Sequence, residues 1–345
     1  MFIKGGLMTY IGEVLQMSEK IYDITIIGGG PVGMYASFYA AMQGLSVKLV
    51  DTLEHLGGQL IAIYPEKYIY DLPGHPKIRA SEMVGKLKEQ MDSYKEKIDI
   101  STDTTVTNVV KQADNTFSIT TTKESFVSRV ALITAGNGAF SPKQLDVDSD
   151  GVANLHYFVT DMMQFKDKNV VIFGGGDSAV DWALMLNGIA KSISVVHRRN
   201  EFRAHASSID KLNASSVKLY TPYKAVELVG SKDHADKVII EHLETKEEII
   251  IDVDDIIVLF GFVSNLGPIK DWGLELRRTA LTVDTLDQTN IAGIFAAGDA
   301  ATFDGKVKMI TTGFGEAVVA INAAKAYAYP DKVHRYQHSS AIGEK

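Results

Sequence analysis

The sequence contains no cysteine among its 345 residues. Without thiols the chain cannot form a disulfide, hold a metal through thiolates or run a dithiol relay. We predict no metal site among its nine histidines.

Long apolar runs and an excess of positive charge are also missing. The longest apolar run, residues 256–263, is far shorter than the roughly 18 residues that a membrane-spanning helix needs. Residues 1–18 lack a basic stretch followed by an apolar one, so we expect no secretory signal and a cytoplasmic protein. The net charge of −8 argues against nucleic acid as a general partner, although it leaves room for a local basic patch.

The composition is that of a globular protein with more than one core. A hydrophobic content of 46% and a charged content of 23% are ordinary for such proteins. Because 345 residues exceed one ordinary core, we expect two domains.

The most organised stretch of the sequence spans residues 21–51. Residues 22–27 have the β-branched character of a buried strand, and a G-x-G-x-x-G turn follows at 28–33. Residues 34–43 predict a helix, and residues 45–51 predict a second strand that ends on an acid. This order of strand, glycine turn, helix and strand is typical of a dinucleotide-binding unit.

Each residue type in this unit suits a nucleotide. Gly28 permits a sharp turn, Gly30 leaves room for a pyrophosphate, and Gly33 lets helix and strand approach closely. The helix N-terminus offers free N–H groups to the phosphates, and the terminal acid can accept the hydroxyls of an adenosine ribose. A glycine-rich turn in another α/β unit is the alternative, which the surrounding elements disfavour. The cofactor-binding residues predicted here are Gly28, Gly30, Pro31, Val32, Gly33 and Asp51.

The same unit occurs a second time. Residues 169–173 predict a strand, 174–179 form a G-x-G-x-x-A turn, 180–186 predict a helix, and 192–196 predict the next strand. Asp51 follows Gly28 by 23 residues, and His197 follows Gly174 by the same 23. The position that contacts the ribose therefore holds a carboxylate in the first unit and the start of a basic trio in the second.

This difference in charge predicts two different nucleotides. A carboxylate repels a 2′-phosphate, whereas arginines bind one through charge-assisted, forked hydrogen bonds. We therefore predict FAD in the first site and NADPH in the second. A solvated strand end is the alternative for the basic trio. The predicted NADPH-binding residues are Gly174, Gly176, Asp177, Ser178, His197, Arg198, Arg199 and Arg203.

Short alternating strands follow each unit. Two predicted β-meanders cover residues 105–133 and 226–253. A late strand at 291–297 ends on Gly298 and Asp299, where the acid can bind a ribitol hydroxyl of a flavin or, alternatively, cap the next helix.

The predicted fold is α/β, with two Rossmann-like nucleotide-binding domains, each with a parallel sheet and a β-meander. We predict an FAD-binding domain at residues 18–137 and 264–345, an NADPH-binding domain at 138–263, and an N-terminal extension at 1–17.

The motifs in this order resemble the thioredoxin reductase group of two-domain flavoproteins. That group carries a C-x-x-C pair shortly before the second glycine turn, where this chain has Tyr157 and Thr160 instead of thiols. With residues 57–60, residues 64–71 and a C-terminal extension, the chain resembles the bacterial ferredoxin/flavodoxin NADP(+) reductases of the thioredoxin reductase type.

The resemblance implies further site residues. It implies that FAD contacts Gly28, Gly30, Gly33, Asp51, Gln59, Tyr64, Val106, Phe140 and Asp299. Tyr64 would stack on one face of the flavin, although a tyrosine at an ordinary turn is the alternative. The tail of a homodimer partner would cover the other face, with His338 and Ser339 as catalytic residues beside Tyr64 and with Ser340 at the cofactor. Composition alone would leave this polar tail disordered.

The implied activity is hydride transfer from NADPH to the flavin and single-electron transfer to ferredoxin or flavodoxin, or the reverse. Glycines near 135–138 and 261–263 would serve a hinge between the domains. An acidic carrier needs a basic surface, for which the candidates are Arg277, Arg278, Lys306, Lys308 and Lys332. The alternatives are a reductase of a disulfide or a quinone, and a non-catalytic FAD- and NADPH-binding sensor.

Overall fold

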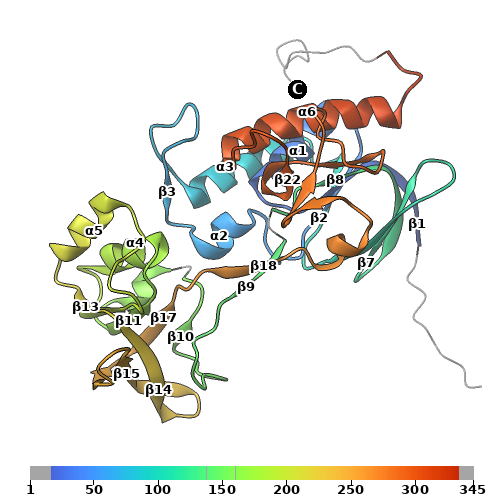
Figure 1. Cartoon of the computed structure of the whole chain (residues 1–345). Coiled ribbons are helices and arrows are strands. Elements are labelled where there is room, and N and C mark those ends of the chain that lie inside the picture. The colour runs from blue at the N-terminus through green and yellow to red at the C-terminus, as the bar shows by residue number, and fades with distance from the viewer. Residues whose placement is uncertain (1–16, 137, 160, 334–345) are drawn as a thin grey trace, which may run out of the picture.

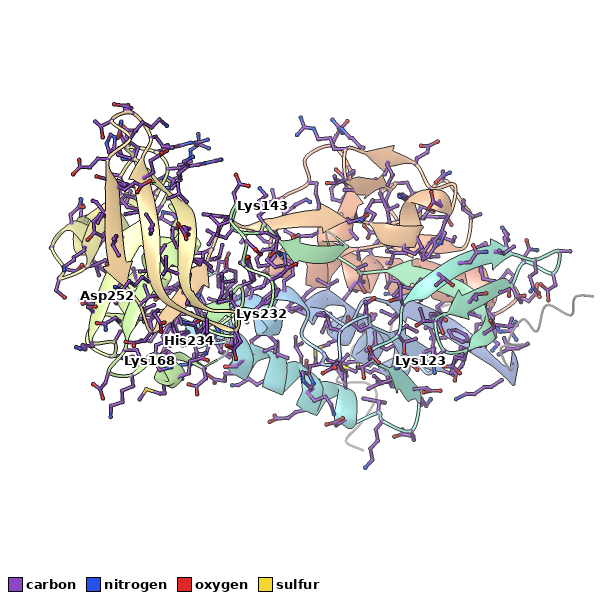
Figure 2. The ribbon with its side chains drawn as sticks, turned by 90° about the horizontal axis from the view of Figure 1, so that it is seen from below. Lys123, Lys143, Lys168, Lys232, His234 and Asp252 are labelled. Atoms are coloured by element: carbon purple, nitrogen blue, oxygen red, sulfur yellow. The ribbon has the colours of Figure 1, made fainter. Side chains whose placement is uncertain are left out.

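The computed structural model describes residues 17–136, 138–159 and 161–333. This part of the chain forms two lobes joined by a narrow connection, as Figure 1 shows. Figure 2 views the lobes from below, with Lys123 on one lobe and Lys168 and His234 on the other. The predicted α/β class is confirmed.

The first lobe is built on a seven-stranded sheet. Its strand order is β5-β2-β1-β8-β7-β6, and β21 pairs with β8. These strands are β1 (Met17–Ile27), β2 (Val47–Val50), β5 (Ile98–Ser101), β6 (Val106–Lys111), β7 (Phe117–Thr121), β8 (Ser125–Ile133) and β21 (Ile294–Ala296). Because β8 pairs parallel with β1 and antiparallel with β7, one strand serves both the parallel sheet and the first meander.

Helices cover one face of this sheet. They are α1 (Pro31–Met42), α3 (Ala80–Asp92) and α6 (Ile310–Ala328), and Figure 1 shows α1 and α6 lying together. Ile24 and Ile26 of β1 share a buried cluster with Ala317 and Ile321 of α6. A second buried cluster, which includes Phe117 and residues from the C-terminal segment, supports the sheet elsewhere.

Short elements complete the first lobe. They are α2 (Gln59–Ile63), β3 (Tyr68–Ile69), β4 (Ile78–Arg79), the 3-10 helices η2 (Gly267–Asp271) and η3 (Gly298–Ala300), β19 (Leu276–Arg277), β20 (Ala280–Thr282) and β22 (Ala301–Thr302).

Two predicted helix starts need correction. Helix α1 begins at Pro31 rather than at residue 34, because proline suits the first helical position. Helix α4 of the second lobe begins at Asp177, three residues before its predicted start.

The second lobe repeats the plan on a five-stranded parallel sheet of order β10-β17-β11-β12-β13. Its elements are β10 (Leu155–His156), η1 (Met162–Phe165), β11 (Asn169–Phe173), α4 (Asp177–Leu186), β12 (Ser192–Val196), α5 (Ala206–Asn213), β13 (Lys218–Tyr220) and β17 (Asp255–Val258). The second meander is β14 (Tyr223–Ser231), β15 (His234–His242) and β16 (Glu248–Asp252), paired antiparallel.

A two-stranded ribbon connects the lobes. Strand β9 (Ala139–Pro142) pairs antiparallel with β18 (Phe262–Asn265), and Figure 1 shows both running between the lobes. Gly138, at φ +80°, has no room for a side chain because a Cβ there would overlap the carbonyl oxygen of Asn265. The domain boundaries predicted near residues 138 and 263 fall beside or within this ribbon, and the division remains a prediction.

Candidate functional site

In the first glycine turn, the space around each position decides whether a side chain would fit there. Gly28 has φ +113°, and a Cβ there would lie 2.7 Å from the backbone of Ala135. At Gly33 a Cβ would overlap the Gly28 carbonyl oxygen, so both glycines are required for packing. At Gly30, no atom of the described part of the chain lies within 4 Å of an added Cβ. It therefore borders open space at the N-terminus of α1, as a pyrophosphate cradle requires.

That open space belongs to a pocket of about 720 Å³, a volume suited to a large cofactor. The pocket is lined by the predicted residues Gly28, Gly30, Pro31, Val32, Asp51 and Gln59, and also by Val106 and Asp299. Gly33 is not among the lining residues and instead supports the turn from behind. The tail residues His338, Ser339 and Ser340 lie outside the described residues, and Phe140 is described only as backbone of β9.

Asp51 is held at the end of β2 by two backbone amides. Its buried carboxylate accepts hydrogen bonds from the N–H groups of Gly29 and, at 2.7 Å, of Leu53. Burial raises the pKa of the Asp51 carboxyl, and the two amide hydrogen bonds oppose this effect. Each carboxylate oxygen has a second lone pair, so the group can still accept hydroxyls from a ligand in the pocket.

The opposite wall of the pocket includes the turn at Gly298 and Asp299. Gly298 has φ +72°, and a Cβ there would lie 3.1 Å from Val32. The Lys308 ammonium donates a hydrogen bond to the Asp299 carbonyl at 3.2 Å. Ile310, the first residue of α6, also lines the pocket. The N-termini of α1 and α6 are therefore both at the pocket, where they favour anionic groups.

The second glycine turn is tied to the basic segment that follows β12. The Arg203 N–H donates to the Gly175 carbonyl at 2.6 Å, and the Asp177 carboxylate accepts the N–H of His205 at 3.0 Å. An added Cβ at Gly176 would meet only the Arg203 carbonyl, at 3.8 Å. The basic segment is thereby fixed beside the N-terminus of α4.

A smaller cavity of about 310 Å³ lies within this segment and is lined by residues 199–203. The His197 ring stacks on Phe202 with centroids 5.4 Å apart, and Gly175 leaves space for that ring. Burial lowers the pKa of the His197 imidazole, and the charges of the neighbouring arginines lower it further. Burial and the neighbouring charges therefore favour the neutral imidazole, and the arginines supply the positive charge of this segment.

Tyr64 contacts the second lobe and is not among the residues that line the first pocket. Its hydroxyl forms a hydrogen bond with the Ser178 hydroxyl of that lobe. Beside it, Lys67 forms an ion pair with Asp181 of α4 at 3.0 Å. Tyr64 thus connects the end of α2 with the second glycine turn, and its stacking on a flavin remains a prediction.

Sequence reasoning missed several lining residues. Phe158 lines the first pocket although it belongs to the other lobe, and its ring stacks on Phe262 at 5.6 Å. Its segment, residues 157–161, was singled out only for its missing thiols. The adjoining walls at residues 104–105 and 266–269 carry no motif that could have identified them.

The predicted basic surface needs one correction. The Lys306 side chain is only 5% exposed and is paired with Glu316, so it cannot belong to a surface patch. Arg277 is exposed but pairs with Asp304 at 2.6 Å. In the described ranges, no cluster of three or more His, Asp or Glu could hold a metal ion. None of the helices described is both long and apolar enough to cross a membrane.

Comparisons with known proteins agree with this geometry. Residues 22–324 match the model of the pyridine nucleotide-disulphide oxidoreductase family. Relatives named ferredoxin–NADP reductase 2 are 51% identical over 333 residues in Bacillus licheniformis (96% of this chain, 99% of the relative) and 50% identical over 328 residues in Bacillus anthracis (94% and 98%). A crystal structure of Lactococcus lactis thioredoxin reductase shares the fold, with a TM-score of 0.74 and 24% identity, covering 90% of this chain and 99% of that one. The chain therefore belongs to the pyridine nucleotide-disulphide oxidoreductase family, among the ferredoxin–NADP reductases.

Proposed function

We propose that the protein is an FAD-dependent reductase that moves electrons between NADPH and ferredoxin or flavodoxin. One observation carries the proposal. The two matching units of strand, glycine turn, helix and strand are followed by opposite charges, Asp51 in the first and the arginines of residues 198–203 in the second. The ferredoxin–NADP reductase name of the relatives supports ferredoxin as the carrier. A cytoplasmic homodimer with the domain division predicted above completes the proposal.

The residues of the first pocket fit FAD. Gly30 and the N-terminus of α1 would meet the pyrophosphate, Asp51 would accept ribose hydroxyls, and Asp299 would accept a ribitol hydroxyl. When bound, FAD supplies hydride chemistry at N5 and single-electron transfer. In the second turn, Arg199 and Arg203 would bind the 2′-phosphate of NADPH.

The absence of thiols reduces the number of reactions that the site could carry out. Phe158 lies at the flavin pocket, and its segment holds Tyr157 in place of a cysteine. No group there can form a mixed disulfide, which favours direct electron transfer to a carrier. In the proposed dimer, the partner's tail would cover the second flavin face. His338 and Ser339 would act there as catalytic residues, and Ser340 would contact the cofactor.

A stopped-flow experiment tests the function. FAD-loaded protein should be reduced much faster by NADPH than by NADH, and ferredoxin or flavodoxin should then reoxidise it. Reoxidation by a low-molecular-weight disulfide or a quinone but by neither carrier would support the alternative reductase. Absence of flavin bleaching by NADPH would support the sensor.

The proposed tail role has its own test. Removal of the chain from Tyr336 onward should change the rates of NADPH-dependent dye reduction and ferredoxin reduction in different proportion. Identical rates for the full and shortened chains would remove the tail from the mechanism.

A further inference from the structure

Three charged side chains are buried together behind the pocket wall. Lys306 precedes α6, Glu316 lies within α6, and Asp287 lies between β20 and β21. The side chains of Lys306 and Glu316 are 5% and 10% exposed and form an ion pair, while Asp287 is 4% exposed. Burying charges of this kind costs free energy unless they are paired, so a buried charged cluster next to a site indicates a role in that site.

The ion pair holds one residue of the pocket from both sides. Glu316 Oε2 accepts the N–H of Gly298 at 2.8 Å, and Lys306 Nζ donates to the carbonyl of Gly298 at 2.9 Å. The opposite side of Gly298 faces Val32 of α1. Because Gly298 and Asp299 line the pocket, the pair fixes the turn that would carry the ribitol contact.

Asp287 is attached to the same turn through β21. Its φ is +59°, its N–H donates to the Asp284 carbonyl at 3.1 Å, and its own carbonyl accepts the N–H of Ala296 at 2.9 Å. Strand β21 ends at Ala296, two residues before Gly298. The position of the Asp287 main chain and that of the pocket turn are therefore linked.

The charge of this carboxyl changes near neutral pH. Burial raises the pKa of Asp287 to about 7, and the Glu316 carboxylate contributes to the rise. Asp284 acts in the same direction, whereas the Lys306 ammonium acts against it. With Lys306 and Glu316 both charged, protonation of Asp287 moves the net charge of the cluster from −1 to zero.

We propose that Lys306 and Glu316 are positioning residues for the flavin, and that the buried carboxyl of Asp287 adds to the pH dependence that the flavin reduction potential has by itself. This inference rests on the proposed FAD site. Reduction makes the flavin more negative, so a nearby carboxylate disfavours it, and uptake of one solvent proton by Asp287 relieves that repulsion. In general, a unit charge about 10 Å from a redox centre, at an effective dielectric constant of about 20, shifts the redox equilibrium roughly tenfold.

The first test measures the flavin midpoint potential against pH in FAD-loaded wild-type protein and in D287N. Below about pH 6 both carry a neutral group and should have equal potentials. Above about pH 8 the D287N potential should be higher by about 30 mV, which corresponds to a tenfold shift for a two-electron couple. The control D114N changes an exposed acid in the turn between β6 and β7 and should follow the wild type. Parallel curves for D287N and wild type over the whole range would overturn the role of Asp287.

The second test measures FAD affinity. K306M removes the donor to Gly298 and should weaken FAD binding at least tenfold, whereas K325M should not. Lys325 is the matched control because it also lies on the C-terminal segment and donates to a main-chain carbonyl, that of Gln43, at 2.8 Å. Unchanged FAD affinity in a folded K306M protein would overturn the positioning role.

Should K306M fail to fold, the double variant K306M/E316Q decides the question because it removes both charges of the ion pair and leaves no unpaired carboxylate at residue 316. It should fold and still bind FAD more weakly than wild type, since Gly298 lacks its lysine donor; wild-type affinity would count against the proposal. Wild-type protein that takes up no FAD would instead refute the proposed function itself.

Discussion

Replacement of Gly30 by alanine should weaken FAD binding strongly without harming the fold. The backbone at Gly30 has φ −67° and ψ −179°, which any residue adopts, and an added Cβ would meet nothing within 4 Å. A folded apoprotein therefore accepts the methyl group easily. The methyl would, however, occupy the part of the pocket where a pyrophosphate approaches the N-terminus of α1.

The size of the effect follows from contact distances. An N–H donor and a phosphate oxygen bond at about 2.9 Å, whereas a carbon atom needs about 3.5–4.0 Å. The methyl group of G30A would therefore displace the phosphate by about 1 Å and remove at least one charge-assisted hydrogen bond. Such a bond contributes about 1.5–3 kcal/mol, so FAD affinity should fall by about 10- to 100-fold.

The assay is titration of the apoprotein with FAD, followed by flavin fluorescence, with the apoprotein melting temperature measured in parallel. G85A is the matched control, because Gly85 also has nothing within 4 Å of an added Cβ but lies in the interior of α3. It should leave FAD affinity unchanged and stabilise the helix by about 0.5–1 kcal/mol. In contrast, G33A should unfold the unit, since its Cβ overlaps the Gly28 carbonyl oxygen. FAD affinity of G30A within twofold of wild type would refute the assignment of the cradle.

Three further predictions concern cofactor choice and stability. R199A should lower kcat/KM for NADPH by about 10- to 100-fold and leave that for NADH unchanged, since it removes a charge-assisted phosphate contact; an equal loss with both would contradict it. D255N should destabilise the protein by about 2 kcal/mol at pH 7 in urea unfolding. Burial raises the pKa of the Asp255 carboxyl, but hydrogen bonds from His156 and Lys168 outweigh burial and hold that pKa below its usual value. The difference in unfolding free energy between D255N and wild type should therefore vanish as pH falls through the lowered pKa. A difference that persists in acid would disprove this. T25V should be neutral or stabilising by up to about 1 kcal/mol, because the Thr25 hydroxyl is buried and has no hydrogen-bond partner among the residues that the structure describes. A clear loss of stability would show that the hydroxyl is bonded.

Local signals were sufficient to predict both units of strand, glycine turn and helix. A buried strand, a glycine turn and a helix occur within about thirty residues, and each step has its own sequence pattern. The structure shows this order in β1 with α1 and again in β11 with α4. Helix α2 was not predicted, because five residues are too few to show a helical period and two glycines with positive φ precede it.

Contacts between segments that are far apart in the sequence could not be predicted from local sequence patterns. Lys306 lies close to Lys308, and a short lysine-containing segment before a helix is usual for a solvated surface. Its burial depends on Glu316, which enters the core only because α6 packs against the sheet with its first turns at Gly298. A charge pattern therefore predicts a surface only where no partner of opposite charge faces it from another element.

The contact between the lobes extends this argument to the site itself. Tyr64 and Ser178 are 114 residues apart, and their hydrogen bond exists only because the ribbon of β9 and β18 sets one lobe beside the other. Phe158 reaches the first pocket for the same reason. Residues that bind a nucleotide within one lobe can be identified from its motif, whereas residues that connect the two sites depend on how the lobes are placed. Tyr64 lies at that junction, so a rearrangement of the lobes that separates α2 from α4 breaks its bond to the turn proposed to bind NADPH.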